Sequence, residues 1–283
     1  MNVRAENTAR EVRLRRVFGE RKRTRKKLPR QHPPLGIERD YGRALAALMR
    51  EIRAAYQPLL EALPGLTATA ITERERVDAG ETKEVLRLMA LARSAFNRAF
   101  DFGRLGRIAE QFGKKTTDYQ KVQLKRQTTA ALGVDILMPD KRLASLIEAF
   151  VDSNVGLIKN LGEKTAQGIE AKVMQAITTG TRHETLAKDL EETFLFSEKR
   201  AMLIARDQVG KAYGQANAQR QRELGVTRFI WHSVNDSRVR DEHRERNGKT
   251  YSYADPPDGE LPGEPVLCRC YGEPILDDIL EGL

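Results

Sequence analysis

Apolar residues recur at intervals of three and four along most of the chain, which is the period of an amphipathic helix. The two clearest stripes consist of Val85, Leu88, Met89, Ala92, Phe96 and Phe100, and of Leu143, Leu146, Ile147, Phe150, Val151 and Ile158. The same period predicts helices over residues 37–63, 165–178, 182–194 and 197–225. We expect Pro58 to kink or end the first of these, because proline removes a helix hydrogen bond.

Local signals set the expected limits of these helices. The three prolines of "LPRQHPPLG" disfavour helix and predict a linker over residues 28–36, and "LPGLT" predicts a break after the first helix. Asp140 fits an N-cap and Gly180 fits a C-cap. Gly210 and Gly214 lie one turn apart inside the last helix, where each costs about 1 kcal/mol relative to alanine. Their small face predicts close approach of another backbone.

The pattern changes after residue 225, where apolar and polar residues begin to alternate. "VTRFIWHSV", "KTYSYA" and "VLCRCYGEPIL" are rich in residues that favour strands. "NDSRVRDEHRER" predicts a short helix that begins at Asp236 and ends at the turn "NG". "DPPDGELPGEP" has four prolines and two glycines, which predicts a loop.

These patterns predict a mainly α protein with three parts. Residues 1–36 form a basic arm, expected to be disordered, and the proline-rich linker. Residues 37–225 form an elongated helical body, and residues 226–283 form a small β-rich (α+β) C-terminal module. No apolar run approaches the ~18 residues of a membrane span, so we expect a soluble protein without a membrane partner.

The positive charge of the chain is concentrated at its N-terminus. Residues 1–30 hold twelve lysines and arginines and three acids, a net charge of +9 that equals that of the whole chain. The densest cluster comprises Arg21, Lys22, Arg23, Arg25, Lys26 and Lys27. Such an arm attracts phosphates by counterion release without reading a base sequence. It predicts non-specific DNA contact, while an anionic protein or membrane surface fits equally well.

The two cysteines of the chain, Cys268 and Cys270, stand one residue apart in the C-terminal module. Alternate residues of a strand point to one face, so both sulfurs can face one site with His243. Zinc prefers about four nitrogen, sulfur or oxygen ligands, and the candidates for the fourth are Asp236, His232, Glu264 or a water. Two buried cysteines beside a structural histidine, or a strained local disulfide, are the alternatives to zinc. We expect Arg269 to face away and to pair with a carboxylate such as Asp241.

Catalytic motifs are absent from the sequence. There is no G-x-S-x-G, no H-E-x-x-H and no glycine-rich phosphate loop after a strand, so we expect no enzyme. "DEHRERNGK" is loosely similar to a His-Asn metal-nuclease site, but no second histidine follows it. A metal-dependent DNA-processing enzyme, such as a nuclease, is the alternative function.

The order of motifs in the C-terminal half resembles the phage Mu F-like head morphogenesis family of minor head or minor capsid proteins. The resemblance covers about residues 140–276. The matching positions are Arg206, Asp207, Gln208, Trp231, Asp236, Arg238, His243, Gly248, Cys268, Arg269 and Cys270. Many family members carry a C-x-x-C where this chain has Arg240 and His243, and this departure removes two thiol ligands of a zinc module.

The resemblance implies a minor head protein of a tailed phage, associated with head assembly, DNA packaging and DNA ejection. Its implied place is inside the capsid near the portal, after assembly in the host cytoplasm. The implied partners are the portal protein, the major capsid or scaffolding protein, and DNA. The basic arm fits this role, since a DNA-filled capsid supplies a polyanion.

Overall fold

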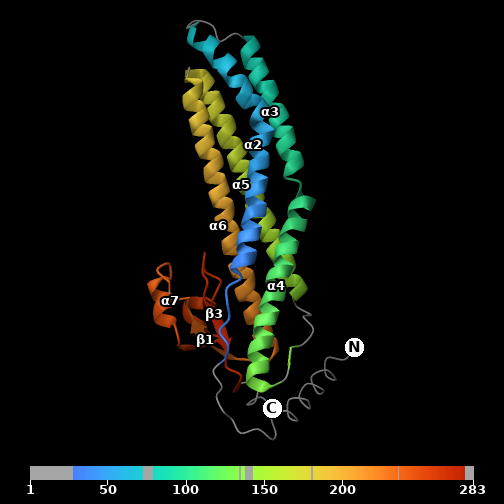
Figure 1. Cartoon of the computed structure of the whole chain (residues 1–283), viewed down its shortest axis with the longest axis vertical. Helices are drawn as coiled ribbons and strands as arrows, with labels where there is room; N and C mark the ends of the chain where they lie inside the picture. Colours follow the sequence, from blue (N-terminus) through green and yellow to red (C-terminus); the bar gives the residue numbers. More distant parts are fainter. Residues whose placement is uncertain are drawn as a thin grey trace. The chain divides into compact units, whose positions relative to one another are not determined.

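The computed structural model describes residues 28–72, 79–133, 135–137, 143–179, 181–234 and 236–277. Several predictions lie outside these residues. They are the basic cluster Arg21, Lys22, Arg23, Arg25, Lys26 and Lys27, the disorder of the arm, the N-cap Asp140 and the C-cap Gly180. The described residues form a mainly α protein with a small antiparallel sheet near the C-terminus, as the sequence predicted (Figure 1).

Five long helices account for most of the described residues. They are α2 (Leu35–Thr72), α3 (Ala79–Ala99), α4 (Phe102–Leu132), α5 (Leu143–Thr179) and α6 (His183–Glu223). Within the described residues, none of them combines the length and apolar character that a membrane span requires.

The first helix continues past Pro58 and "LPGLT", so neither of them ends it, and a kink at Pro58 stays a prediction. Tyr56 and Leu59, on either side of Pro58, are almost completely buried. Burial of two such large side chains offsets the roughly 3 kcal/mol that an interior proline costs. The helices predicted separately at 165–178 and 182–194 are likewise parts of the longer α5 and α6.

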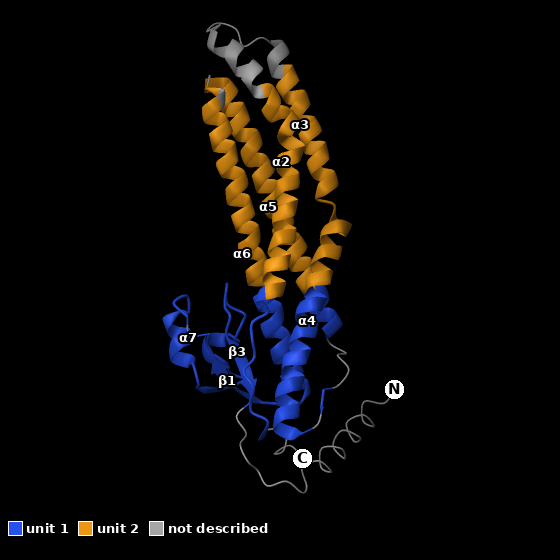
Figure 2. Cartoon of the chain, viewed as in Figure 1, with its two compact units in different colours: residues 1–35, 113–148, 209–283 blue, residues 36–112, 149–208 orange. Residues whose placement is uncertain are grey.

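The chain folds into two compact units (Figure 2). Unit 1 comprises residues 1–35, 113–148 and 209–283, and unit 2 comprises residues 36–112 and 149–208. Helices α4, α5 and α6 contribute residues to both units. The units divide the chain differently from the predicted parts at 1–36, 37–225 and 226–283, because the β-rich module shares its core with helical residues on the N-terminal side of residue 225.

Unit 2 is a packing of helices along apolar faces, with polar links at a few crossings. The ring of Tyr41 stacks on Phe112 with centroids 4.6 Å apart. Its hydroxyl donates to Asn154 Oδ1 at 2.9 Å, and Asn154 Nδ2 donates to Gln208 Oε1 at 3.1 Å. These bonds satisfy polar groups that would otherwise be buried without partners. Gln208 is one of the positions that carry the resemblance to the Mu F-like family, and here its side chain bonds to Asn154.

Unit 1 holds a three-stranded antiparallel sheet in the order β2-β1-β3. Its strands are β1 (Arg228–His232), β2 (Thr250–Ser252) and β3 (Tyr271–Pro274). The three predicted strands therefore exist, but the third begins only after both cysteines. Leu267 has a φ of 56°, a left-handed conformation that interrupts an extended chain before the sheet.

The short helix α7 (Asp241–Arg246) connects β1 to β2. The prediction that it begins at Asp236 is wrong, because Asp236 starts a turn instead. Its Oδ1 accepts from the backbone N–H of Arg238 at 3.1 Å, and its carbonyl accepts from that of Val239 at 3.2 Å. The predicted end is correct, because the chain turns at Asn247 and Gly248, and Gly248 has a φ of +80°.

Candidate metal centre

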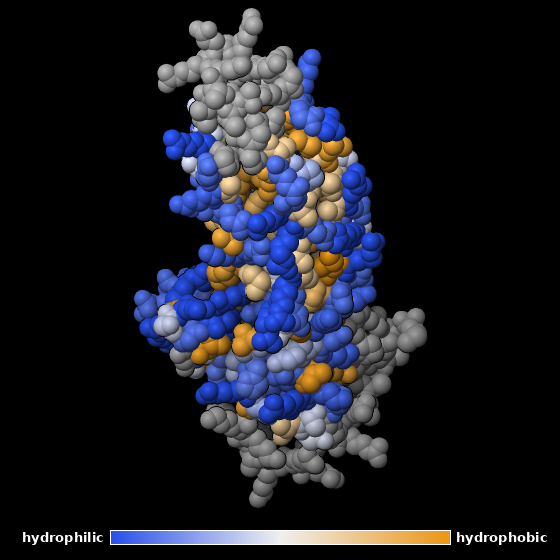
Figure 3. All heavy atoms as spheres, turned by 45° about the horizontal axis from the view of Figure 1, so that its top comes forward, coloured by the Kyte–Doolittle hydropathy of each residue, from blue (hydrophilic) through white to orange (hydrophobic). Residues whose placement is uncertain are grey.

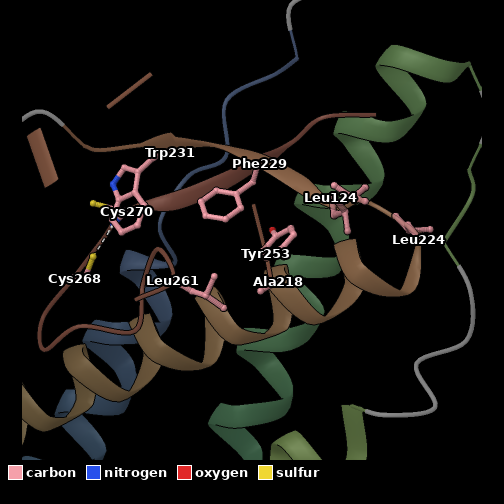
Figure 4. Close-up of a cluster of buried hydrophobic side chains, with 10 residues drawn as sticks. Leu124, Ala218, Leu224, Phe229, Trp231, Tyr253, Leu261, Cys268 and Cys270 are labelled. Atoms are coloured by element: carbon pink, nitrogen blue, oxygen red, sulfur yellow. Dashed lines mark hydrogen bonds between the residues drawn. The ribbon is translucent and has the colours of Figure 1, made fainter. Parts of the chain in front are cut away.

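A buried apolar cluster in unit 1 includes the two cysteines, which lie at one end of it beside Trp231 (Figure 4). Its members are Leu124, Ala218, Leu224, Val226, Phe229, Trp231, Tyr253, Leu261, Cys268 and Cys270. They come from α4, α6, β1 and the loops on either side of the sheet. Burying these side chains together fixes the segment that carries the cysteines.

His243 on α7 meets both cysteines in this core. Its Nδ1 lies 3.5 Å from Cys268 Sγ and 3.5 Å from Cys270 Sγ. All three side chains are buried, and their ligand atoms lie within 4.8 Å of one another. The structure therefore brings together the three residues that the sequence singled out as metal ligands.

The spacing of these atoms fits a tetrahedral metal. Zn–S bonds of ~2.3 Å and Zn–N bonds of ~2.0–2.1 Å at a tetrahedral angle place nitrogen and sulfur about 3.5 Å apart. Both His243–sulfur distances have this value. Two thiols and an imidazole are also the soft donor set that zinc prefers. The three residues therefore fit the metal by geometry and by chemistry.

The pKa values of the two thiols are shifted in opposite directions. A hydrogen bond with Cys270 lowers the pKa of Cys268 below that of an ordinary thiol, assisted by backbone N–H donors of Cys270 and Gly263. The same contact and burial raise the pKa of Cys270. One thiolate is thus favoured over two in the absence of a cation. Both thiols are free, so the disulfide alternative is not what the structure forms.

The second ring nitrogen of His243 faces a carboxylate. Nε2 lies 3.8 Å from Glu260 Oε2, and Arg246 ion-pairs with both Glu260 and Asp258. The guanidinium of Arg246 lies 5.1 Å from the centre of the Trp231 ring. A carboxylate on the outer nitrogen of a ligating histidine orients the ring and raises its basicity. Arg246 and Glu260 were not predicted, and they meet only because the 256–268 loop folds back.

The three side chains considered as a fourth metal ligand, Asp236, His232 and Glu264, contact other groups. The carboxylate of Asp236 pairs with Arg269, so Arg269 pairs with a carboxylate as expected, but the partner is Asp236 and not Asp241. His232 Nε2 lies 3.1 Å from Glu273, and Glu264 accepts from the backbone N–H of Leu261. Among the described residues, the metal-binding group therefore has three members, and a water is the remaining fourth ligand of those considered.

The loop that carries the cysteines is seated on the two glycines of α6. A Cβ at Gly210 would lie 3.0 Å from the carbonyl oxygen of Cys268. A Cβ at Gly214 would lie 2.6 Å from the carbonyl oxygen of Pro262 and 3.0 Å from the Cα of Gly263. The predicted close backbone approach is confirmed, and its partner is this loop.

A layer of buried amides joins α6 to the sheet. Asn217 and Gln221 both donate to the carbonyl of Gly272 on β3, at 2.7 and 2.8 Å. Asn217 Oδ1 accepts from Gln31 and Gln120, so the linker and α4 meet at the same side chain. This layer was not predicted. Its signal is the run of polar residues "QANAQRQ" within a helix whose alanines are buried.

The other positions that carry the family resemblance lie around the three candidate ligands or on α6. Trp231 is fully buried, with its ring edge on His243 at a centroid distance of 5.2 Å. The amide of Gly248 donates to the carbonyl of Trp231 at 2.7 Å. Asp207 accepts from the side chain of Gln208, and its neighbour Arg206 has a buried Nε without a hydrogen bond among the described residues. Arg238 is exposed and contributes its backbone to the turn at Asp236.

Comparisons with known proteins point to the same region of the chain. Residues 167–272 match the family model described as phage Mu protein F like protein. An uncharacterized protein of Haemophilus influenzae is 34% identical over 159 residues, which are 55% of this chain and 35% of the relative. The chain thus spans about a third of the length of that relative. No solved structure matches.

The matched segment contains the later part of α5, all of α6, the sheet up to β3 and the three candidate ligands. The match over residues 167–272 supports the resemblance to the phage Mu F-like family that the motifs predicted, and it suggests a phage head morphogenesis protein.

Proposed function

We propose that this chain is a minor head protein of a tailed phage, acting inside the capsid at the portal during head assembly, DNA packaging and DNA delivery. The family match over residues 167–272 carries the proposal. The match also contains the three candidate ligands and nine of the ten residues of the buried cluster in unit 1. The portal protein is the proposed main partner, with the major capsid or scaffolding protein as further contacts.

We propose that zinc binds His243, Cys268 and Cys270. When bound, the cation stabilises both cysteines as thiolates and cross-links α7 to the loop before β3. His243 would supply Nδ1, while its opposite nitrogen faces Glu260 and its ring packs against the indole ring of Trp231. A centre of this kind stabilises the fold of unit 1 and has no substrate.

The basic arm is proposed to contact packaged DNA without reading its sequence. Support comes from the net charge of +9 within residues 1–30. Deleting these residues removes up to twelve cations, so DNA affinity should fall and its dependence on salt should flatten. A deletion variant that binds DNA with the salt dependence of the full chain would refute this role. Binding to the portal should be unchanged by the deletion.

The nuclease alternative is less well supported by the donor set. Nucleases that use magnesium need oxygen ligands, whereas this group offers two sulfurs and one nitrogen. Incubating the protein with plasmid and a divalent metal tests the alternative. Steady cleavage that disappears in a His243→Ala variant would establish an enzyme and overturn the structural role.

Deleting the gene in a phage that encodes this chain tests the proposed function. We expect cells that make fewer filled heads, with normal production restored by the wild-type chain supplied in trans. Electron microscopy of the lysate and measurement of packaged DNA give the result. Filled, infectious heads at the wild-type yield without the chain would refute a role in head morphogenesis.

A further inference from the structure

Trp231 carries a buried polar group that apolar packing does not explain. The residue is 0% exposed, so it is not part of the mostly hydrophilic surface of which Figure 3 shows one face. No acceptor among the described residues has hydrogen-bonding geometry with its indole Nε1–H. A tryptophan N–H usually has a partner when it is buried, because a donor without an acceptor is destabilising. A phenylalanine would bury a similar ring without this penalty, so the N–H itself indicates a function.

The sulfur of Cys270 is the acceptor that this N–H faces. Figure 4 shows the indole nitrogen of Trp231 beside the sulfur of Cys270, within the buried cluster. The pKa of Cys270 is raised by its contact with Cys268 and by burial, and the indole N–H acts on the same thiol in the opposite direction. The two groups are therefore close enough to interact, although their geometry is not that of a hydrogen bond.

A cysteine sulfur becomes a much stronger acceptor when it binds a metal. A neutral thiol accepts hydrogen bonds weakly, whereas a metal-bound cysteine is a thiolate and attracts N–H donors. The sulfur of Cys268 has such donors in the backbone, because the N–H of Cys270 lies 3.4 Å from it and that of Gly263 also faces it. The indole N–H of Trp231 would supply the corresponding donor to the sulfur of Cys270.

The ring of Trp231 also contacts the candidate nitrogen ligand. The imidazole of His243 meets the indole edge-on, with the ring centroids 5.2 Å apart and the planes at 71°. The guanidinium of Arg246 lies over the indole, 5.1 Å from the ring centre. Arg246 pairs with Glu260, whose carboxylate faces Nε2 of His243. Trp231 therefore touches both kinds of candidate ligand, the imidazole through its ring and a thiol through its N–H.

We propose that Trp231 is a positioning residue of the metal centre and that its indole Nε1–H donates a hydrogen bond to the sulfur of Cys270 in the zinc-bound chain. The inference rests on the proposed zinc site and adds to it the residue that holds one thiolate in place. Contacts of this kind orient metal ligands and tune their donor strength. If Trp231 only fills the core, its shape matters and its N–H does not.

The test measures the zinc affinity of the full chain by competition with a chromophoric chelator. The wild type is compared with a Trp231→Phe variant and with a chain that carries 3-benzothienylalanine at position 231. This analogue keeps the shape of the indole but has a sulfur atom in place of the N–H. Because Trp231 is the only tryptophan in the sequence, incorporating the analogue in place of tryptophan changes no other position.

The matched control is Phe229→Leu. Phe229 is another fully buried aromatic residue of β1, and its ring packs against Tyr253 with the centroids 4.6 Å apart. Thermal unfolding of each purified chain verifies that it is folded. If Trp231→Phe does not fold, the analogue of the same shape still gives the comparison.

We expect both changes at Trp231 to weaken zinc binding at least about tenfold, and Phe229→Leu to bind zinc within about twofold of the wild type. The absorption spectrum of the cobalt(II)-loaded chain gives a second readout, since cobalt binds the same nitrogen and sulfur donors. A hydrogen bond lowers the energy of the sulfur lone pairs. Its loss should therefore move the sulfur-to-cobalt charge-transfer band to longer wavelength in both Trp231 chains and not in the control.

The outcomes separate this inference from the zinc site itself. Wild-type affinity and an unchanged cobalt spectrum in the 3-benzothienylalanine chain would overturn the role of the N–H and leave the zinc site intact. The same would follow if Trp231→Phe alone bound zinc weakly, because packing on His243 would then account for the effect. A wild-type chain that binds no zinc would overturn the proposed metal site and this inference with it, whereas the role in heads is tested separately by the gene deletion.

Discussion

Units 1 and 2 share helices α4, α5 and α6 but are stabilised in different ways. In unit 2 the helices pack along continuous apolar stripes, and buried polar groups such as Asn154 link single helix crossings. In unit 1 a few residues from distant parts of the chain form hydrogen bonds to the same side chain. Asn217 alone joins the linker, α4 and β3. Apolar area is spread over many residues, whereas directional contacts depend on each one, so unit 1 should be the more sensitive to single substitutions.

Removal of zinc should give the largest difference between the units. With free zinc at about 1,000 times its Kd, a metal that binds only the folded state adds about 4 kcal/mol of stability. A chelator should therefore lower the unfolding temperature of unit 1 while leaving that of unit 2 unchanged. Trp231 is the only tryptophan in the sequence and lies in unit 1, so its fluorescence reports unit 1, whereas helical circular dichroism reports both units.

A Cys268→Ser, Cys270→Ser variant is the control for the chelator experiment. It should bind no zinc by elemental analysis, and its Trp231 transition should not respond to the chelator. If the chelator does not shift the Trp231 transition of the wild type either, then His243, Cys268 and Cys270 hold no metal. The alternative of two cysteines packed beside a structural histidine would then stand.

An Asn217→Leu substitution should be the next most damaging change. It leaves the buried amide of Gln120 without its acceptor and removes one donor from the Gly272 carbonyl. Buried groups without partners cost about 1–3 kcal/mol each, so we expect a loss of about 3 kcal/mol in urea unfolding followed by Trp231 fluorescence. Gln219→Leu on the same helix, where the amide binds only Glu223 among the described residues, should change stability by less than about 0.5 kcal/mol.

Replacing a glycine of α5 or α6 by alanine should change stability in opposite directions in the two units. Gly214→Ala in unit 1 forces the loop at Pro262 away from α6 and should cost about 2 kcal/mol. Gly156→Ala in unit 2 meets nothing within 4 Å and should stabilise α5 by about 1 kcal/mol. Chemical denaturation of both variants gives the comparison. Equal effects of the two substitutions would contradict the seating of the loop on α6.

The Asp236–Arg269 pair should give the smallest effect. Its hydrogen bond with Arg269 lowers the pKa of Asp236, so the pair stabilises the fold above the ordinary carboxyl pKa of about 3.9. That contribution disappears as the pH falls through the lowered pKa. Because the carboxylate is partly exposed, Asp236→Asn should cost less than about 1 kcal/mol near neutral pH. Urea unfolding at neutral and strongly acidic pH should show the difference between variant and wild type vanishing in acid.

The helices of unit 2 were largely predictable because their signal is local. Val85, Leu88, Ala92 and Phe96 recur at helical spacing, and all four are buried. The boundaries were not predictable from local signals alone. Pro58 lies inside α2, and Gly162 lies inside α5, where the ring of Phe100 fills the space of a side chain. In both places tertiary packing outweighs the local preference.

Only those residues of the candidate site that have metal-binding side chains could be predicted from the sequence. Two cysteines and a histidine are rare enough in this chain to be noticed, and the structure brings them together. Glu260 and Arg246 are ordinary charged residues in the sequence, and Asn217 and Gln221 are ordinary amides. Their roles arise from contacts with residues far along the chain, such as the Gly272 carbonyl, which no local pattern encodes.

The most direct test of the proposed function is quantitative mass spectrometry of purified phage particles and of empty procapsids, counting this chain relative to the portal protein. The account predicts a few copies per portal in both. Absence from both would contradict a minor head protein and would favour an assembly factor or an enzyme that acts outside the particle.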